Sequence, residues 1–351
     1  MERIKGVSLF SSAGIAELYL RDVGIDIKVA SELIEKRCNL HKFLYPDCEM
    51  IQGDISSCNI FDLINKEIHR NKCKFLLATP PCQGMSSLGK KEYSKDKRNF
   101  LIFYVLDIID NNEFDYILIE NVPKFLKLYF PFEGETLKLI DICKKKYSAK
   151  YCVDSFILNA KDFNVPQSRP RGFIRIWKKG LKWGIPSPSK EITLRECIGN
   201  LPSLYPGEDS GIKWHFAKLH NKREILAMIH TPEGKSALKN TIYYPKKQNG
   251  EPIKGFHNTY KRMKWDEPSP ARAMNSGNLG GHNNGHPGKA LPDGTFSDPR
   301  VLTLRELFIV SSIDPDWNLP NWATDNFIRQ VIGEAIPPNL AKAICSGIIK
   351  I

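Results

Sequence analysis

Short apolar runs alternate with amphipathic stretches along residues 1–180. Such runs are typical of buried strands, and apolar residues three or four positions apart are typical of helices. The expected strands are Gly6–Phe10, Ile27–Ser31, Met50–Gln52, Lys74–Ala78, Asp115–Glu120, Lys150–Leu158 and Gly172–Trp177. The expected helices include Ala16–Val23, Leu33–Leu44, Asn99–Ile109 and Gly134–Lys145. This alternation predicts an α/β fold, a mostly parallel Rossmann-like sheet with helices on both faces.

The pattern changes after about Leu181, where prolines interrupt the chain and long periodic stretches disappear. Residues 276–294 are rich in Gly, Asn and His and are predicted to form a loop. Helical character returns at Thr303–Phe308, at Thr324–Ile332 with Thr324 or Asp325 as cap, and at Asn339–Ile349. We therefore predict a catalytic and cofactor-binding domain over residues 1–180, completed by 325–351, and a smaller irregular domain over 181–324.

Polar residues follow most of the expected strands. Ser11–Gly14 follow the first strand, Glu32 the second, Asp54 the third, Pro80–Cys82 the fourth and Glu120 ends the fifth. In open α/β sheets, ligands bind at the carboxyl ends of the strands. The sequence therefore predicts a ligand site along this edge of the sheet.

Cys82 is the candidate nucleophile. A single cysteine is more often a buried structural residue. Here two prolines stiffen a turn at the end of a strand, and a basic, glycine-containing loop, Gly84–Lys97, follows. A reactive thiolate needs partial exposure and positive surroundings, which this segment can provide.

Three charged residues are candidates for the same site. Glu120 faces the same cleft as Cys82 if the fourth and fifth strands are neighbours. Arg169 and Arg171 are separated by one residue, so on an extended chain they point the same way, as suits a carbonyl or phosphate group.

Glu32 indicates a nucleoside-containing ligand, because an acidic residue at the end of the second strand commonly binds ribose hydroxyls. The glycine pattern of dinucleotide sites is absent from the turn after the first strand. S-adenosylmethionine, which carries no phosphate, is compatible with a turn that contains less glycine.

Composition and charge narrow the function further. Of 351 residues, 42% are hydrophobic and 26% charged, as in folded soluble proteins, and no apolar run is long enough to span a bilayer. The net charge is +12, and Lys178–Lys264 holds 17 Lys and Arg against 7 Asp and Glu, which favours a polyanion-binding region. Nine scattered cysteines without a C-x-x-C pair argue against disulfides and a metal site. With no signal-peptide pattern at Met1–Lys5, a cytoplasmic protein is expected.

Several motifs together resemble the cytosine-5 DNA methyltransferases of bacterial restriction–modification systems. They are Pro81-Cys82-Gln83 with Ser86, Glu120-Asn121-Val122, Gln167-Ser168-Arg169-Pro170-Arg171, Arg305-Glu306 after Leu302-Thr303, and Pro337-Pro338. They occur in the family's order and cover nearly the whole chain except the middle of the basic region.

The resemblance implies transfer of a methyl group from S-adenosylmethionine to carbon 5 of a flipped-out cytosine in double-stranded DNA. It implies that Cys82 attacks C6, that Glu120 holds N3 and the amino group, and that Arg169 contacts the base carbonyl with Arg171 beside it. It places target recognition between Arg171 and Arg300, within the irregular domain. It also implies a monomer, with a cognate restriction endonuclease acting on the same DNA site. The cofactor pocket would be lined by Phe10, Ser11, Ser12, Ala13, Gly14, Glu32, Leu33, Asp54, Ile55, Pro81 and Leu101.

Four positions depart from the family pattern. Ser12 stands where the family usually has glycine, as does Ile15; Met85 stands for phenylalanine and Glu334 for asparagine.

Two alternatives remain. An RNA (tRNA) cytosine-5 methyltransferase could use the same scaffold, but the large basic region favours DNA. A non-catalytic nucleic-acid-binding protein could keep the fold, but Cys82, Glu120, Arg169 and Arg171 are all intact.

Overall fold

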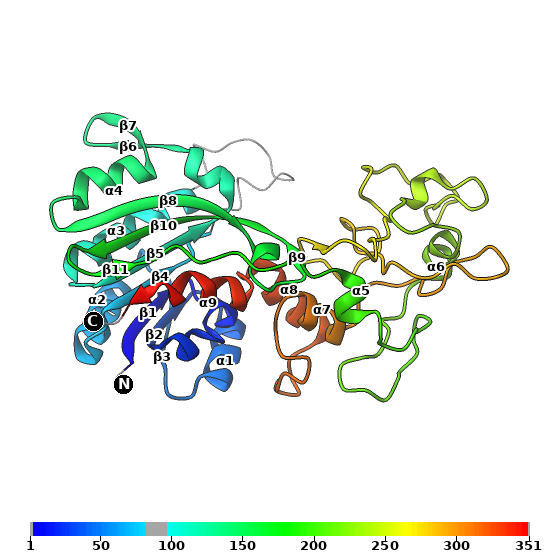
Figure 1. The fold of residues 1–351 in the computed structure, drawn as a ribbon, viewed down its shortest axis with the longest axis horizontal. Coiled ribbons are helices and arrows are strands. Elements are labelled where there is room, and N and C mark those ends of the chain that lie inside the picture. The colour runs from blue at the N-terminus through cyan, green and yellow to red at the C-terminus, as the bar shows by residue number, and fades with distance from the viewer. Residues whose placement is uncertain (1–2, 82–96, 350–351) are drawn as a thin grey trace. The chain divides into compact units, whose positions relative to one another are not determined.

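The computed structural model describes residues 3–81 and 97–349 (Figure 1). Cys82, Met85 and residues 84–96 of the predicted loop lie outside the described residues. The chain divides into two compact units. The first unit comprises Met1–Asn159, Pro170–Ser187 and Leu340–Ile351, and the second comprises Ala160–Arg169 and Pro188–Asn339.

The first unit is built on a seven-stranded sheet in the order β3-β2-β1-β4-β5-β10-β8. Strands β1 to β5 are parallel to their neighbours, whereas β10 runs antiparallel to both β5 and β8. The mostly parallel fold is thus confirmed, and all seven expected strands form. They are β1 (Ile4–Leu9), β2 (Ile25–Glu32), β3 (Glu49–Gln52), β4 (Phe75–Ala78), β5 (Tyr116–Asn121), β8 (Tyr151–Asn159) and β10 (Pro170–Lys178).

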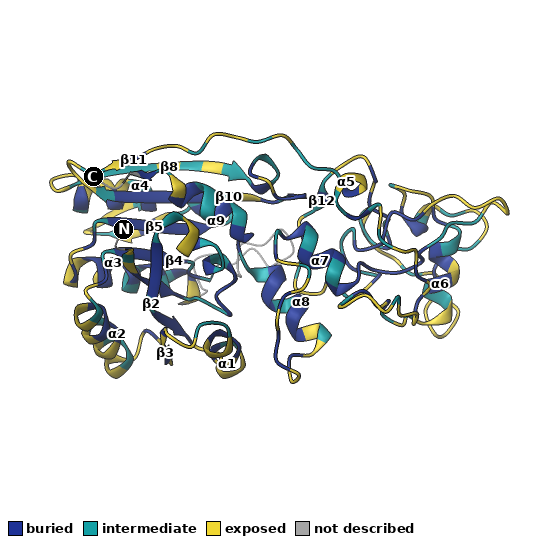
Figure 2. Cartoon of the chain, turned by 60° about the horizontal axis from the view of Figure 1, so that its bottom comes forward, coloured by how far each residue is buried: buried dark blue, intermediate teal, exposed yellow. Residues whose placement is uncertain are grey.

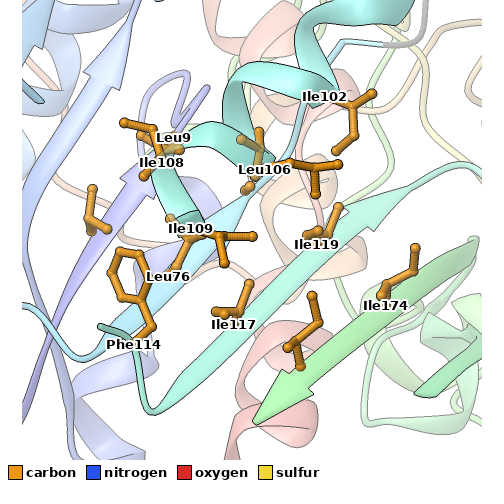
Figure 3. Packing of buried hydrophobic residues seen from close by; sticks show 14 of the residues in the cluster. Leu9, Leu76, Ile102, Leu106, Ile108, Ile109, Phe114, Ile117, Ile119 and Ile174 are labelled. Carbon is orange, nitrogen blue, oxygen red and sulfur yellow. The ribbon is translucent and has the colours of Figure 1, made fainter. Parts of the chain in front are cut away.

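Three helices share a hydrophobic core with one face of this sheet. They are α2 (Cys58–Asn71), α3 (Leu101–Asn111) and α4 (Leu139–Tyr147). Figure 3 shows how α3 packs: Ile102, Leu106 and Ile109 lie against the aliphatic side chains of β4, β5 and β10. Alternate residues of each strand enter this core, as the two-residue period of a strand requires.

The other residues of the strands face away from that core. Helices α1 (Glu35–Leu44) and α9 (Pro338–Ser346) cover this side (Figure 1). The C-terminal segment is fixed to the sheet unit where the Trp183 indole donates to the carbonyl of Ile344 at 2.8 Å, and where β11 (Lys182–Trp183) pairs with β13 (Ile348–Ile349). Strands β1, β2, β4 and β5 are mostly buried, β8 is partly exposed, and the outer faces of α1 and α2 are exposed (Figure 2).

Two expected helices differ in the structure. Residues 16–23 form two short 3-10 turns, η1 (Ile15–Glu17) and η2 (Leu20–Val23), because Gly14 and Gly24 at either end adopt positive φ angles of 74° and 78°. The other expected helix, Gly134–Lys145, begins later than predicted. Its first residues form strand β7 (Glu135–Lys138), which pairs with β6 (Tyr129–Phe132) before α4 begins.

The second unit has few regular elements, as its prolines and glycines predict. Its helices are α5 (Leu194–Ile198), α6 (Lys222–Ile229), α7 (Leu304–Val310) and α8 (Asp325–Glu334), with short turns η6 (Ala160–Asp162) and η7 (Ala237–Lys239). Thr303 caps α7 through a reciprocal bond with Glu306, and Thr324 is the N-cap residue of α8, as expected. Residues 276–294 contain no helix or strand.

The compact units and the predicted domains have different boundaries. Residues 160–169 and 325–339 belong to the second unit, and 181–187 to the first. Long-range hydrogen bonds explain why residues 160–169 and 325–339 belong to the second unit. Strand β9 (Gln167–Ser168) pairs with β12 (Ser269–Pro270), and Arg329 of α8 donates to the carbonyl of Leu302 at 2.9 Å. How the two units divide catalysis and recognition stays a prediction.

Buried arginines hold the second unit together. Arg262 is fully buried and donates to the carbonyls of Met228, His286 and Asp298 at 2.8–3.0 Å. Arg300 is also fully buried and forms ion pairs with Asp298 and Glu306, both at 2.8 Å. A buried carbonyl outside a regular element needs a donor, and these guanidinium groups supply it.

Candidate active site

The strand order reverses between β1 and β4, which is where open α/β sheets bind ligands. The turn after β1 is tightly wound: Phe10, Ser12 and Gly14 have positive φ angles of 59°, 51° and 74°. It is joined to the end of β4, because the Thr79 hydroxyl donates to the carbonyl of Phe10 at 3.0 Å. The backbone around this point is therefore fixed from both strands.

Glu32, at the end of β2, holds the same turn. Its side chain is 7% exposed, and its two carboxylate oxygens accept the backbone N–H groups of Ser12 at 3.0 Å and Ile34 at 2.9 Å. Each carboxylate oxygen has a further lone pair. Glu32 therefore both shapes the turn after β1 and keeps acceptor capacity for a hydroxyl ligand.

The other predicted cofactor residues differ in exposure. Leu33 is 60% exposed beside Glu32, whereas Phe10 and Leu101 are partly buried against the core. Asp54 is exposed and accepts from the backbone and hydroxyl of Ser56 at 2.9 and 2.8 Å. Three further predicted residues, Ser11, Ser12 and Pro81, have intermediate exposure.

Three of the predicted cofactor residues have no exposed side chain to offer. The side chains of Ala13 and Ile55 belong to the buried interior. A Cβ at Gly14 would lie 2.4 Å from the Tyr45 ring, so this position requires glycine. Their contribution to a ligand would come from the backbone.

Glu120 and Arg171 form the charged pair of the site. Glu120 is on β5 and Arg171 on the adjacent β10, and the arginine Nε lies 2.9 Å from the glutamate Oε1. The side chains are only 9% and 13% exposed. Strands β4 and β5 are parallel neighbours, so Glu120 ends the strand beside the one that leads to Cys82.

Asn121 is a functional candidate that the sequence did not single out as a site residue. It is buried, its side-chain Nδ2 donates to the backbone carbonyl of Pro80 at 3.0 Å, and its side-chain Oδ1 accepts from the backbone N–H of Val122 at 2.8 Å. Asn121 thus ties the end of β5 to the residue two positions before Cys82. The feature of the sequence that could have identified Asn121 is its position directly after Glu120.

Arg169 does not share the environment of Arg171. It belongs to the second unit, where its guanidinium donates to the carbonyls of Arg272 at 2.7 Å and Gly333 at 2.6 Å. Strand β9 ends at Ser168 and β10 begins at Pro170, so the extended chain that would align the two arginines is interrupted. Arg171 is the arginine whose ion pair with Glu120 lies within the first unit.

The buried cysteines among the described residues are poor nucleophiles. Burial raises the pKa of Cys38 to about 11 and those of Cys73 and Cys143 to about 12. Such thiols stay protonated at neutral pH. All cysteines of the described ranges are free thiols, and no group of potential metal ligands occurs there.

A family model described as C-5 cytosine-specific DNA methylase matches residues 4–350. The chain belongs to this family. It is therefore a DNA methyltransferase that modifies carbon 5 of cytosine. Type II methyltransferase M1.HgaI of Avibacterium volantium is 43% identical over 98% of this chain and 97% of its own length. Type II methyltransferase M1.HphI of Haemophilus parahaemolyticus is 28% identical over 98% of this chain and 86% of its own.

Solved structures share the fold of this methyltransferase. A protein encoded within an Escherichia coli prophage has a TM-score of 0.68 at 20% identity and covers 98% of both chains. Spodoptera frugiperda DNMT2 has a TM-score of 0.59 at 19% identity, covering 96% of this chain and 97% of its own. Within the described residues, no helix is long and apolar enough to cross a membrane.

The structure explains why glycine is the usual residue at one of the four positions. Ser12, where the family usually has glycine, has a φ of 51°, a conformation that favours glycine. Glu334 is the last residue of α8, whose C-cap is Ala335. Nothing in the described structure explains Ile15 or Glu334 as alternatives to the family residues.

Proposed function

We propose that this methyltransferase uses S-adenosylmethionine to methylate one cytosine within a specific double-stranded DNA sequence, as the modification enzyme of a restriction–modification system. The Avibacterium and Haemophilus relatives are named type II methyltransferases, which supports this assignment. A cognate endonuclease would act on the same sequence without stable binding. The enzyme would work as a monomer in the cytoplasm, where its DNA substrate lies.

The main observation that supports this proposal is the ion pair between Glu120, near the end of β5, and Arg171 of β10. C5 of cytosine is a weak nucleophile until a nucleophile adds to C6. We assign that addition to the Cys82 thiolate, which forms the C6–S bond while the Glu120 carboxyl donates a proton to N3. Arg171, held beside Glu120, would hydrogen-bond the base carbonyl and stabilise the charge that develops there. The family resemblance implies this contact for Arg169, which stays a prediction, and we propose Arg171 for it because of its pairing with Glu120.

The residues around Glu32 fit the methyl donor. Glu32 has acceptor capacity for ribose hydroxyls, and exposed Leu33 offers an apolar surface to a purine ring. When bound, S-adenosylmethionine supplies an electrophilic methyl group to C5. The C5 proton then passes to a base, for which water suffices, and the C6–S bond breaks to release Cys82.

The decisive experiment compares wild-type protein with Cys82→Ala on duplex DNA and on tRNA, with a radiolabelled methyl donor. We expect wild type to label duplex DNA and the variant to label neither. Wild type should also form a denaturation-resistant adduct with duplex DNA containing 5-fluorocytosine, because fluorine cannot leave as the proton does. Labelling of tRNA instead of DNA would favour the RNA alternative, and normal turnover by Cys82→Ala would overturn the mechanism.

A second experiment separates the two arginines. Arg171→Gln should slow single-turnover methylation by roughly 100-fold or more, as loss of an oxyanion-type donor does, with little change in the melting temperature. Arg169→Gln should lower the melting temperature, since two buried carbonyls lose their donor. Glu120→Gln should slow the chemical step by roughly 100- to 10,000-fold, since it removes the transferable proton. A slower single-turnover rate only in Arg169→Gln would reverse the assignment.

The cofactor assignment has its own test. Glu32→Ala should raise the dissociation constant for S-adenosylmethionine measured by calorimetry. Unchanged affinity would remove Glu32 from the pocket.

A further inference from the structure

One hairpin of the second unit has the features of a base-reading element. Residues 245–253 fold back through an antiparallel bridge between Lys246 and Pro252, and the N–H of Lys247 donates to the carbonyl of Glu251 at 2.8 Å. Gly250 at the tip has a φ of 84°, and no atom lies within 4 Å of the position of a Cβ there. Residues 246–252 are all exposed. The hairpin therefore projects from its own unit.

The base of the hairpin is fixed. Tyr243 and Ile253 pack against the small core formed by Ala227, Met228, Ala237, Tyr260, Leu279 and Val301. The Tyr244 hydroxyl donates to the carbonyl of Ile253 at 3.0 Å, and Asn240 donates to the carbonyl of Tyr243 at 3.1 Å. An exposed tip on a fixed base can present side chains in a defined orientation.

The side chains of the hairpin fall into two groups. Lys247 forms an ion pair with Glu251 at 2.9 Å, and the Asn249 side chain accepts from the N–H of Glu251 at 3.2 Å. The side chains of Lys247 and Asn249 therefore make their bonds within the turn. Lys246 and Gln248 make no such bond to any described residue. Lys246 is at the bridge, and Gln248 lies in the turn that follows it. Both residues therefore have polar groups available for an outside partner.

Lys246 and Gln248 line a cleft of about 180 Å³ between the hairpin and α6. Arg223 of α6 lies on its opposite side and forms no ion pair with a described carboxylate. The carboxylate of Glu224, which also lines the cleft, accepts from the Tyr260 hydroxyl at 3.2 Å. The cleft therefore has two available cations and a primary amide side by side.

Many other lysine and arginine side chains of the basic region, Lys178–Lys264, are buried or form ion pairs within the protein. Arg262 is buried, Arg195 pairs with Asp266 at 2.7 Å, and Lys190 pairs with Glu196 at 3.2 Å. The excess positive charge in the sequence is thus a poor guide to which residues face DNA, whereas Arg223 and Lys246 keep their charge available.

We propose that the hairpin of residues 245–253 enters a groove of the duplex and that Gln248 reads a base edge of the target sequence, with Lys246 and Arg223 holding phosphates. A two-stranded ribbon fits the major groove, and a glutamine amide can pair with an adenine edge there. Cations next to the reading side chain fix the register without reading sequence. This inference rests on the proposed function, because it assumes a sequence-specific duplex substrate.

The test measures methylation by full-length protein on a library of duplexes with randomised positions. Gln248→Ala should lose discrimination at one base pair by roughly 10- to 100-fold while still methylating the original target. Lys246→Gln should weaken binding to all sequences and reduce the log–log salt slope by about one. A matched control should keep both properties: Lys66→Gln on exposed α2 of the first unit.

Wild-type sequence preference in Gln248→Ala together with an unchanged salt slope in Lys246→Gln would overturn the inference. Melting temperatures within a degree or two of wild type would establish that the variants fold, as expected for exposed positions. Failure of the wild-type protein to methylate any duplex would instead overturn the proposed function. The two failures are therefore distinguishable.

Discussion

In the first unit, seven strands satisfy one another's backbone groups, and an aliphatic core packs against the sheet. In the second unit, many backbone carbonyls outside the seven-stranded sheet accept from arginine side chains instead. Arg169, Arg262, Arg272, Arg300 and Arg329 all donate to such carbonyls, and each is at most 3% exposed. Both units therefore supply donors to buried backbone carbonyls, by different means.

The difference has consequences for tolerance to mutation. A sheet ladder depends on the backbone, so many side chains can maintain it, whereas an arginine that bonds several carbonyls cannot be replaced by another residue type. The second unit gains irregular loops that can project side chains outward. In return, its fold depends on a few side chains.

The largest expected effect is at Arg262. Arg262→Met should lower the free energy of unfolding by roughly 3–6 kcal/mol, because three buried carbonyls lose their donor. In the first unit, Ile117→Val should cost only about 1 kcal/mol. Urea unfolding of both variants measures the contrast. Equal losses would mean that the guanidinium bonds contribute no more than ordinary packing.

Acidification should also distinguish the units. Burial, together with the charge of Arg300, lowers the pKa of His286 in the second unit to about 4. Burial opposes ionisation of Glu306, yet the Arg300 charge lowers the pKa of that carboxyl to about 2. The unfolded chain therefore binds more protons, so stability falls as pH drops from 6.5 to 4 through His286 and from 4.5 to 2 through Glu306.

His286 alone should account for roughly 3 kcal/mol of this loss. Hydrogen exchange at pH 7 and pH 4.5 should reveal faster opening of the second unit at the lower pH. His286→Gln should reduce the pH dependence between 6.5 and 4. An unaltered profile in that variant would assign the acid sensitivity to other groups.

A smaller effect is expected at Asn121, which we interpret as a positioning residue in the first unit. Asn121→Ala should cost about 1–3 kcal/mol of stability, because the Pro80 carbonyl and the Val122 N–H lose their partner. It should also slow adduct formation with 5-fluorocytosine DNA without changing cofactor affinity.

The matched variant is Asn121→Asp, which keeps the acceptor for Val122 but replaces the donor to Pro80. It should have the same slow adduct formation as Asn121→Ala. A wild-type rate in Asn121→Asp would show that the bond to Pro80 does not position the nucleophile.

The smallest effect is expected at Ser12. Because its φ is 51°, Ser12→Gly should raise the free energy of unfolding by about 1 kcal/mol. Ser11→Gly, at a neighbouring position without a positive φ, should lower it by a similar amount. Thermal unfolding without cofactor measures both. Destabilisation by Ser12→Gly would mean that the serine side chain stabilises the turn more than its conformation costs.

The sequence by itself determined the strands of the main sheet and the order of the chemical motifs along the chain. The seven strands, the cap at Thr324 and the position of Glu120 at a strand end all follow from local spacing, because strands and helices impose fixed periods on nearby residues. Local spacing could not reveal that residues 16–23 form 3-10 turns between two left-handed glycines.

Only the tertiary structure decided which polar groups meet. It paired Glu120 with Arg171, placed Arg169 on the carbonyls of Arg272 and Gly333, and buried Arg262 within the basic region. Each of these partners is distant in sequence, and the sequence patterns of buried, paired and exposed arginines are the same. A guanidinium binds whichever acceptor the folded backbone presents, so its role is set by long-range packing.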